Sequence, residues 1–154
     1  MSVDGYKREL LYRKAHGKSL ISLYKAKLSL LLGTEPDDTL FLNLSETDDV
    51  IKKLMQRKSL STENAEFTTL SECLKCYSIR VIDGEYVLLL DEDWRYCGAY
   101  RVRNVTINAD FDFNRLQSDE IRLISEDLRT EIAIDYSEFY NEEIFELRIT
   151  NYES

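Results

Sequence analysis

The apolar residues of this chain change their spacing near residue 77, and this change is the strongest constraint on its fold. Before it, apolar positions recur every three or four residues, as on one face of a helix; after it, they alternate or form short β-rich runs. Asp83-Gly84 separates two such runs and favours a two-residue hairpin turn, because both central positions need positive φ. The second half therefore predicts short antiparallel strands in "YSIRVI", "YVLLLDED", "WRYCGAYRVR", "VTINADFDF", "EIRLIS", "RTEIAIDY" and "IFELRITNY".

The first half predicts helices. A Leu-, Lys- and Arg-rich stretch over 4–32, broken at Gly17 and stopped at Gly33, indicates two helices. "LFLNL" predicts a short extended piece. A helix over 46–58 follows, with Ser45 and Asp48 as a capping box, and "STENAEFTTLSECLKCY" predicts a further helix capped by Ser61 or Thr62.

These elements together predict one α+β domain over 1–154. Residues 1–76 form its mainly helical part, and 77–154 form its mainly antiparallel β part. We expect the N-terminal helices to pack on a C-terminal antiparallel sheet of about six to seven strands. A length of 154 residues is enough for a core without disulfides or metals.

Charge is unevenly distributed along the chain. The formal net charge is −9; residues 104–154 alone carry four Lys or Arg against thirteen Asp or Glu. Fixed surface charge steers association, so such a surface repels nucleic acid and attracts basic partners. Direct nucleic-acid binding is therefore disfavoured.

No apolar run approaches the length of a membrane span, and the N-terminus has no apolar leader, so the sequence predicts a cytoplasmic protein. Cys73, Cys76 and Cys97 are too few for a zinc site without a fourth ligand, and His16 is isolated. We expect unpaired cysteines and no metal or cofactor. The basic segment 5–16 is interpreted as a helix packed on the sheet in preference to a membrane-surface helix.

The stretch "DEDWRY", residues 91–96, surrounds the only tryptophan. On an extended backbone Asp91 and Asp93 project to one side, and Glu92, Trp94 and Tyr96 project to the other. The acids could anchor cationic groups of a partner, with Trp94 as an interface hot spot. The alternative is a core tryptophan beside a solvated turn.

Two further stretches alternate acids with apolar residues. "NADFDFN" places Asp110 and Asp112 opposite phenylalanines, and "RTEIAIDY" places Glu131 and Asp135 opposite isoleucines. Each strand alone is compatible with an ordinary solvated face. Several such strands in one sheet would create an acidic patch.

The region "YVLLLDEDWRYCGAYRVRNVTINADFDF", together with the size and acidity of the chain, resembles the small acidic immunity proteins that protect bacteria against contact-dependent or polymorphic toxins. The resemblance implies a non-enzymatic protein that binds a cognate toxin domain, frequently a nuclease such as a tRNase. Nucleases need a positive surface to hold phosphates, so an acidic inhibitor is complementary to them.

Three functions remain open at this stage. The leading one is an immunity protein; the others are a small hydrolase with a carboxylate pair such as Asp91 and Asp93, and an adaptor or anti-defence protein for another basic partner. For the binding functions the expected contact residues are Asp91, Glu92, Asp93, Trp94, Tyr96, Asp110, Asp112, Glu131 and Asp135.

Overall fold

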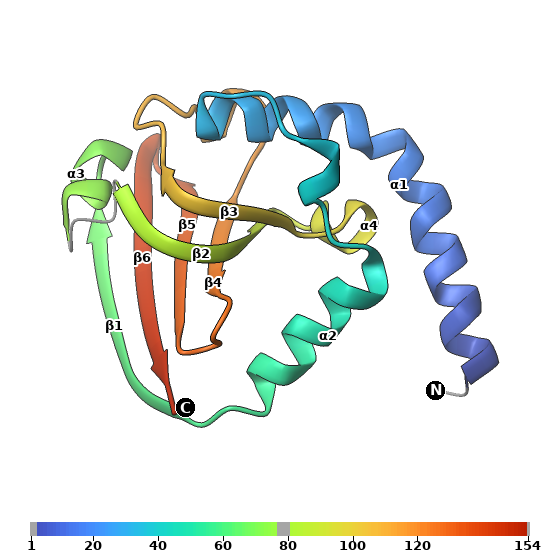
Figure 1. The fold of residues 1–154 in the computed structure, drawn as a ribbon. Helices are drawn as coiled ribbons and strands as arrows, with labels where there is room; N and C mark the ends of the chain where they lie inside the picture. The colour runs from blue at the N-terminus through green and yellow to red at the C-terminus, as the bar shows by residue number, and fades with distance from the viewer. Residues whose placement is uncertain (1–2, 77–80, 154) are drawn as a thin grey trace.

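The protein has an α+β fold with a six-stranded antiparallel sheet, as the sequence predicts. The structure is a computed structural model that describes residues 3–76 and 81–153 (Figure 1). The strands lie in the order β1-β6-β5-β4-β2-β3. Their bounds are β1 Ser59–Phe67, β2 Val81–Leu90, β3 Tyr100–Thr106, β4 Glu120–Ser125, β5 Thr130–Phe139 and β6 Glu142–Tyr152. The sheet is strongly twisted, so β2 and β3 run across the direction of β1 and β6 (Figure 1).

Helix α1 spans Val3–Leu32 without interruption, so the prediction of a break at Gly17 is wrong. Gly17 is needed for a close approach: a Cβ atom there would lie 2.2 Å from the carbonyl oxygen of Tyr96. Gly33, with φ of 74°, ends the helix as predicted.

Helix α2 spans Leu44–Met55 and begins earlier than predicted. Asn43 is its N-cap and forms a capping box with Glu46, in place of the expected pair of Ser45 and Asp48. The preceding extended piece is limited to a single bridge at Phe41, because the short 3-10 helix η1, Asp38–Leu40, occupies the residues before it.

Strand β1, Ser59–Phe67, is the largest departure from the prediction, because the first part of the expected helix over 61–77 is extended. β1 pairs along its length with β6, and the pairing places Ala65 beside Leu147 and Phe67 beside Phe145. Phe67 and the β-branched Thr62 are residue types that are common in strands, and pairing with β6 decides the conformation of the segment. Only Leu70–Lys75, helix α3, remains helical.

The Asp83-Gly84 pair does not form a hairpin turn. β2 continues through it with a register shift between Ile82 and Glu85, and Gly84 has a φ of 102°. The pair therefore marks a bulge within one long strand. The N-terminal end of the predicted strand "YSIRVI" lies outside the described residues.

Two other predicted strand segments are not strands. Residues Trp94–Cys97 form the one-turn helix α4, and β3 starts only at Tyr100. After β3 the chain forms a loop and then helix α5, Phe113–Leu116, where "NADFDF" was expected to be extended. Phe111 and Phe113 are nevertheless buried as predicted.

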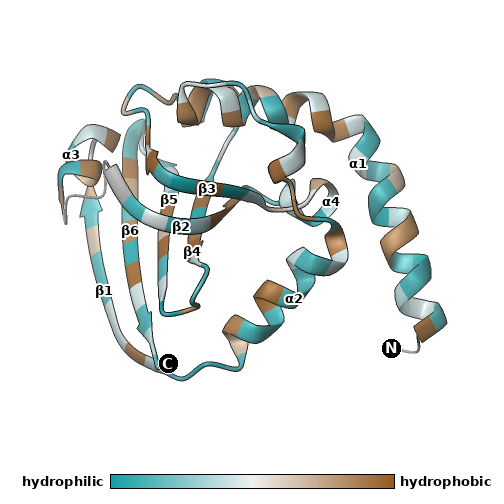
Figure 2. Cartoon of the chain, in the orientation of Figure 1, coloured by the Kyte–Doolittle hydropathy of each residue, from teal (hydrophilic) through white to brown (hydrophobic). Residues whose placement is uncertain are grey.

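The sheet has apolar residues on both faces. The face that we call the α1 face carries Leu88, Leu90, Leu123, Ile134 and Leu147, which join α1, α3 and α5 in the main core. The opposite face, the α2 face, carries Val87, Leu89 and Ile124, which pack with Leu54 of α2 in a smaller cluster. α2 covers only part of its face, and much of β1 and β6 is hydrophilic (Figure 2).

The contact at Gly17 gives the first prediction. Alanine normally stabilises a helix interior relative to glycine, but Gly17→Ala should lower the free energy of unfolding by about 1–3 kcal/mol, because its methyl group would meet the backbone of α4. Ser19→Ala, at an exposed position of the same helix, is the control and should be neutral or slightly stabilising. Urea denaturation measures both; a stabilised Gly17→Ala protein would contradict the contact.

Candidate functional site

Asp91 lies at the end of β2, where it joins three parts of the fold. Its carboxylate accepts hydrogen bonds from Lys27 Nζ of α1 at 2.9 Å, from Ser118 Oγ at 2.7 Å and from the Asp119 backbone N–H at 2.8 Å. Burial works to raise the pKa of Asp91, but the hydrogen bonds, led by that of Ser118, outweigh it and lower the pKa. This carboxylate is therefore already used within the protein.

The rest of "DEDWRY" is a helical turn, so the expected separation onto two sides of a strand is wrong. Glu92 is exposed, whereas Asp93 is half-buried and lies 3.9 Å from Lys27 Nζ. Burial, with a further contribution from the charge of Asp91, raises the pKa of Asp93 despite Lys27. Trp94 is partly buried against both apolar clusters, and the Tyr96 ring packs edge-on against His16. This stretch is mainly structural.

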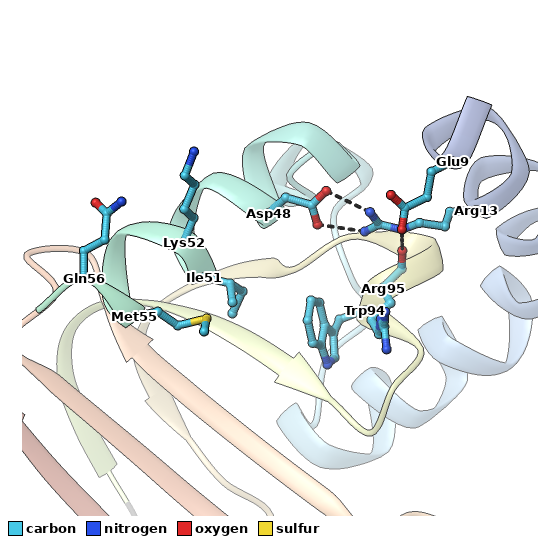
Figure 3. Close-up of a pocket in the computed structure, with 9 residues that line it drawn as sticks. All are labelled: Glu9, Arg13, Asp48, Ile51, Lys52, Met55, Gln56, Trp94 and Arg95. Carbon is cyan, nitrogen blue, oxygen red and sulfur yellow. Dashed lines mark hydrogen bonds and ion pairs between the residues drawn. The ribbon is translucent and has the colours of Figure 1, made fainter. Parts of the chain in front are cut away.

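A groove of about 480 Å³ lies between α1, α2 and α4 (Figure 3). Arg13 crosses its end with two hydrogen bonds to Asp48, at 2.8 and 2.9 Å, and a third to the Arg95 carbonyl. Partial burial opposes ionisation of Asp48, but hydrogen bonds from Arg13 and Tyr6 lower its pKa. Met55 and Trp94 supply the apolar part of the lining. The charged pair at its end fastens α1 to α2, and Glu9 and Lys52 also line the groove.

The α2 face of the sheet carries an unexpected alignment of acids. Strand register places Glu120 directly opposite Asp135, Asp135 opposite Glu146, and Glu146 opposite Glu66. We call these four residues the carboxylate row; it crosses four adjacent strands. Directly paired residues have Cβ atoms about 5 Å apart on one face, so like charges oppose one another three times in succession.

Repulsion in the carboxylate row is partly relieved by a proton. Burial raises the pKa of Glu120 to about 7, and the hydrogen bond and negative charge of Asp135 add to the shift. The guanidinium of Arg148 lies 3.8 Å from the carboxylate of Asp135. Within the described part of the chain, no ion pair reaches Glu146 or Glu66.

A second line of residues beside the carboxylate row is better paired. Arg122 donates two hydrogen bonds to Glu131, which is only 6% exposed. Of the two acids predicted on β5, Glu131 is thus a buried member of an ion pair, whereas Asp135 lies within the carboxylate row.

Asp110 and Asp112 do not share this face. They lie in the loop before α5, and Asp112 caps that helix by accepting a hydrogen bond from the Arg115 N–H at 3.0 Å. Together with Asn141 and Glu143 they line a depression of about 500 Å³ beside the β5–β6 turn.

Three members of the carboxylate row, Glu66, Glu120 and Glu146, are not among the contact residues that the sequence predicts. Glu120 and Glu146 lie in predicted strands, but Glu66 lies in a segment predicted to be helical. Their alignment depends on register between strands that are distant in sequence, and alternation alone does not give that register.

Cys73, Cys76 and Cys97 are free thiols, and burial raises the pKa of Cys73 to about 12 and that of Cys97 to about 11. Among the described residues, no group of three or more His, Cys, Asp or Glu side chains is placed to hold a metal ion. Within residues 3–76 and 81–153, no helix combines the length and apolar character needed to cross a membrane. Comparison with protein-family models, with curated proteins and with solved structures gave no match.

We expect the fold to lose stability when Lys27, the cation beside Asp91, is replaced by a neutral residue. Lys27→Met leaves a buried carboxylate without its ion-pair partner and should lower the free energy of unfolding by about 3 kcal/mol at pH 7. The same change at Lys25, whose pair with Asp38 is exposed, should cost below about 1 kcal/mol. Because the folded pKa of Asp91 is depressed, the difference between parent and Lys27→Met should shrink as the pH falls below about 4. Equal losses in the two variants, measured by urea denaturation, would contradict this role.

The raised pKa of Glu120 changes stability with pH in the opposite direction to the lowered pKa of Asp91. The folded protein binds the extra proton more tightly than the unfolded chain, so stability falls as the pH rises from about 5 to 8. Glu120→Gln should therefore raise the free energy of unfolding at pH 8 by on the order of 1 kcal/mol, after allowance for solvent screening, and should change it little at pH 5. Asp135→Asn should flatten the same pH dependence. A pH-independent effect of Glu120→Gln in urea denaturation would show that the two carboxyls are not coupled.

Proposed function

We propose that this protein is a non-enzymatic binding protein that captures a basic protein domain on the α2 face of its sheet. The observation that carries the proposal is the carboxylate row, in which Glu66, Glu146, Asp135 and Glu120 oppose one another across four strands. Like charges directly opposite one another destabilise a sheet, so this arrangement does not serve folding. A cationic surface docked on the row would remove the repulsion.

Charge pairing elsewhere supports this assignment. Arg13 with Asp48, Lys27 with Asp91, and Arg122 with Glu131 are close pairs between buried or half-buried groups. The fold therefore neutralises the acids that it needs for its own stability. Among residues 3–76 and 81–153, the carboxylate row makes one ion pair, between Asp135 and Arg148 at 3.8 Å, while the charges of Arg122 and Arg148 also act on Glu120.

The biological role that we propose is that of an immunity protein, which neutralises a cognate toxin in the cytoplasm. This follows the resemblance noted in the sequence, and a nuclease toxin such as a tRNase would present the positive surface that the carboxylate row requires. Electrostatic complementarity of this kind chiefly raises the rate of association and excludes wrong partners.

A hydrolase remains the second candidate, and one observation favours it. Glu120, with a pKa near 7 and a hydrogen-bonded partner in Asp135, has the protonation behaviour of a general acid. However, neither residue lines the groove or the depression described above, and general acid–base chemistry requires a substrate held within hydrogen-bond reach. The pair fits a binding surface better.

Binding kinetics with the protein encoded directly upstream of this gene would test the proposal. Asp135→Asn combined with Glu146→Gln should slow association by about 10-fold at low salt and reduce its salt dependence. Because a docked cation favours ionised Glu120, affinity should also rise between pH 6 and 8 with release of a proton.

Strand β1 supplies a matched control. Glu66 and Glu63 lie on the same strand but, with an odd separation, point to opposite faces. Glu66→Gln should slow association, whereas Glu63→Gln should not. If the variants of the carboxylate row bind and protect cells like the parent, the proposal fails; glycosidic or ester hydrolysis lost in Glu120→Gln would favour the hydrolase instead.

A further inference from the structure

The turn between β5 and β6 presents two aromatic rings to solvent. Phe139 is 62% exposed and Tyr140 is 85% exposed, and their ring centroids lie 4.4 Å apart. Such exposure means that neither ring contributes much to the core. We call these two residues the aromatic tip.

The backbone of this turn is unfavourable for its sequence. Tyr140 and Asn141 both have positive φ, 51° and 63°, between the paired residues Phe139 and Glu142, which defines a two-residue primed hairpin turn. Asparagine and glycine are strongly preferred at both positions, and a bulky residue at positive φ is strained. The presence of a tyrosine at position 140 therefore lowers the stability of the turn.

Acids lie on both faces of the β5–β6 hairpin near the aromatic tip. Glu142 is paired with Phe139 and shares its face of the sheet, whereas Glu138 and Glu143 form a directly opposite pair of like charges on the other face. Asp112 lies close enough to act together with Glu143 and Glu138 on the ring of Tyr136, whose pKa is raised by burial and by these three charges. Glu142 is therefore the carboxylate that the strand register places beside Phe139, and the other acids lie on the opposite face of the hairpin.

Strand alternation connects the aromatic tip with the carboxylate row. Asp135, Ser137 and Phe139 alternate along β5 with Tyr136, which packs on the main core, and with Glu138, so their side chains share the α2 face. Asp135 and Phe139 are four residue steps apart on an extended strand, a distance of roughly 13 Å. One partner surface can therefore span both features.

We propose that the aromatic tip is a binding site for arginine side chains of the partner, with the planar guanidinium groups stacked on Phe139 and Tyr140 and their charge balanced by Glu142, the residue paired with Phe139 on the same face. Guanidinium stacks on aromatic faces and pairs with carboxylates at the same time. This inference rests on the proposed function and specifies what the basic partner must present.

Charge complementarity excludes the other occupants of an exposed aromatic pair. A membrane with anionic lipids would be repelled by Glu142 and by the carboxylate row, which lies on the same face as Phe139. A second copy of this chain would bring the same carboxylates together, in a protein whose net charge is −9. A basic protein segment is the occupant that satisfies both the rings and the acids.

The decisive variant is Tyr140→Asn, because asparagine suits the turn. It should raise the melting temperature by about 1–3 °C while weakening binding, so a folding defect cannot explain the loss. The probe is an acetylated peptide of alternating glycine and arginine, titrated into the full chain at pH 8 and low salt and followed by NMR. Tyr140→Asn should weaken its binding about threefold or more.

The control variant is Tyr12→Asn, at a tyrosine that is 68% exposed on α1, and it should bind the peptide like the parent. The matched glycine–glutamine peptide should not bind. Equal peptide affinity of Tyr140→Asn and parent would overturn the inference, as would binding of the parent to phosphatidylserine vesicles or a dimer that Tyr140→Asn dissociates.

The carboxylate-row variants separate this inference from the proposed function. If Asp135→Asn with Glu146→Gln slows binding of the upstream-encoded protein while Tyr140→Asn does not change it, the row stands and the aromatic tip is not part of the interface. If Tyr140→Asn alone weakens that binding, the aromatic tip stands and the proposed role of the row is wrong.

Discussion

The buried ion pair between Lys27 and Asp91 holds the two halves of this fold together. Lys27 lies on α1 and is 5% exposed, and Asp91 directly follows β2 with a positive φ of 53°. Ser118 and the backbone at the start of β4 donate to the same carboxylate. One side chain therefore fixes the position of a long helix, the end of a central strand and the start of its neighbour. A buried carboxylate with so many donors tolerates little displacement, because each lost hydrogen bond would leave its buried charge less well compensated.

The acids of this protein are divided between two environments. Asp48, Asp91 and Glu131 are paired with cations and contribute to the structure. The carboxylate row and the acids beside the β5–β6 turn oppose one another across strands, where they lower stability. A tyrosine at a turn position suited to asparagine adds a further local cost. Such departures from the best choice for stability are expected where a surface is kept for binding.

Most of the fold could be predicted from local sequence, because each half has its own apolar spacing. The failures have a common cause in contacts between distant residues. Gly17 suggested a helix break, but its lack of a side chain accommodates the backbone of α4. The segment of β1 suggested a helix, but it is a strand because it pairs with β6, which lies far along the chain. "NADFDF" alternated correctly, yet Asp112 caps a helix. Phe111 and Phe113 are buried in the loop and helix, as they would be in a strand. Their spacing therefore could not distinguish a strand from a loop followed by a helix.

The candidate surface was only partly predictable for the same reason. Asp135 could be identified because its own strand alternates, and the acidity of the last third of the chain was evident from composition. Glu66, Glu120 and Glu146 become neighbours of one another or of Asp135 only through the register of four strands. Asp91, the most prominent acid of "DEDWRY", is instead an internal ligand of Lys27. Neighbouring sequence cannot distinguish an acid that binds inward from one that faces solvent.

The position of β1 beside β6 also governs the order in which the molecule can be assembled. β1 ends at Phe67, and the strand that pairs with it starts at Glu142. During synthesis, helices α1 and α2 can form as soon as they emerge, but β1 has no neighbour until β6 has been translated. A long loop must close to bring them together, and such non-local pairing is intrinsically slow. The nascent chain therefore carries an unpaired strand through most of its synthesis, and completion of the carboxylate row at Glu66 is among the last events of folding.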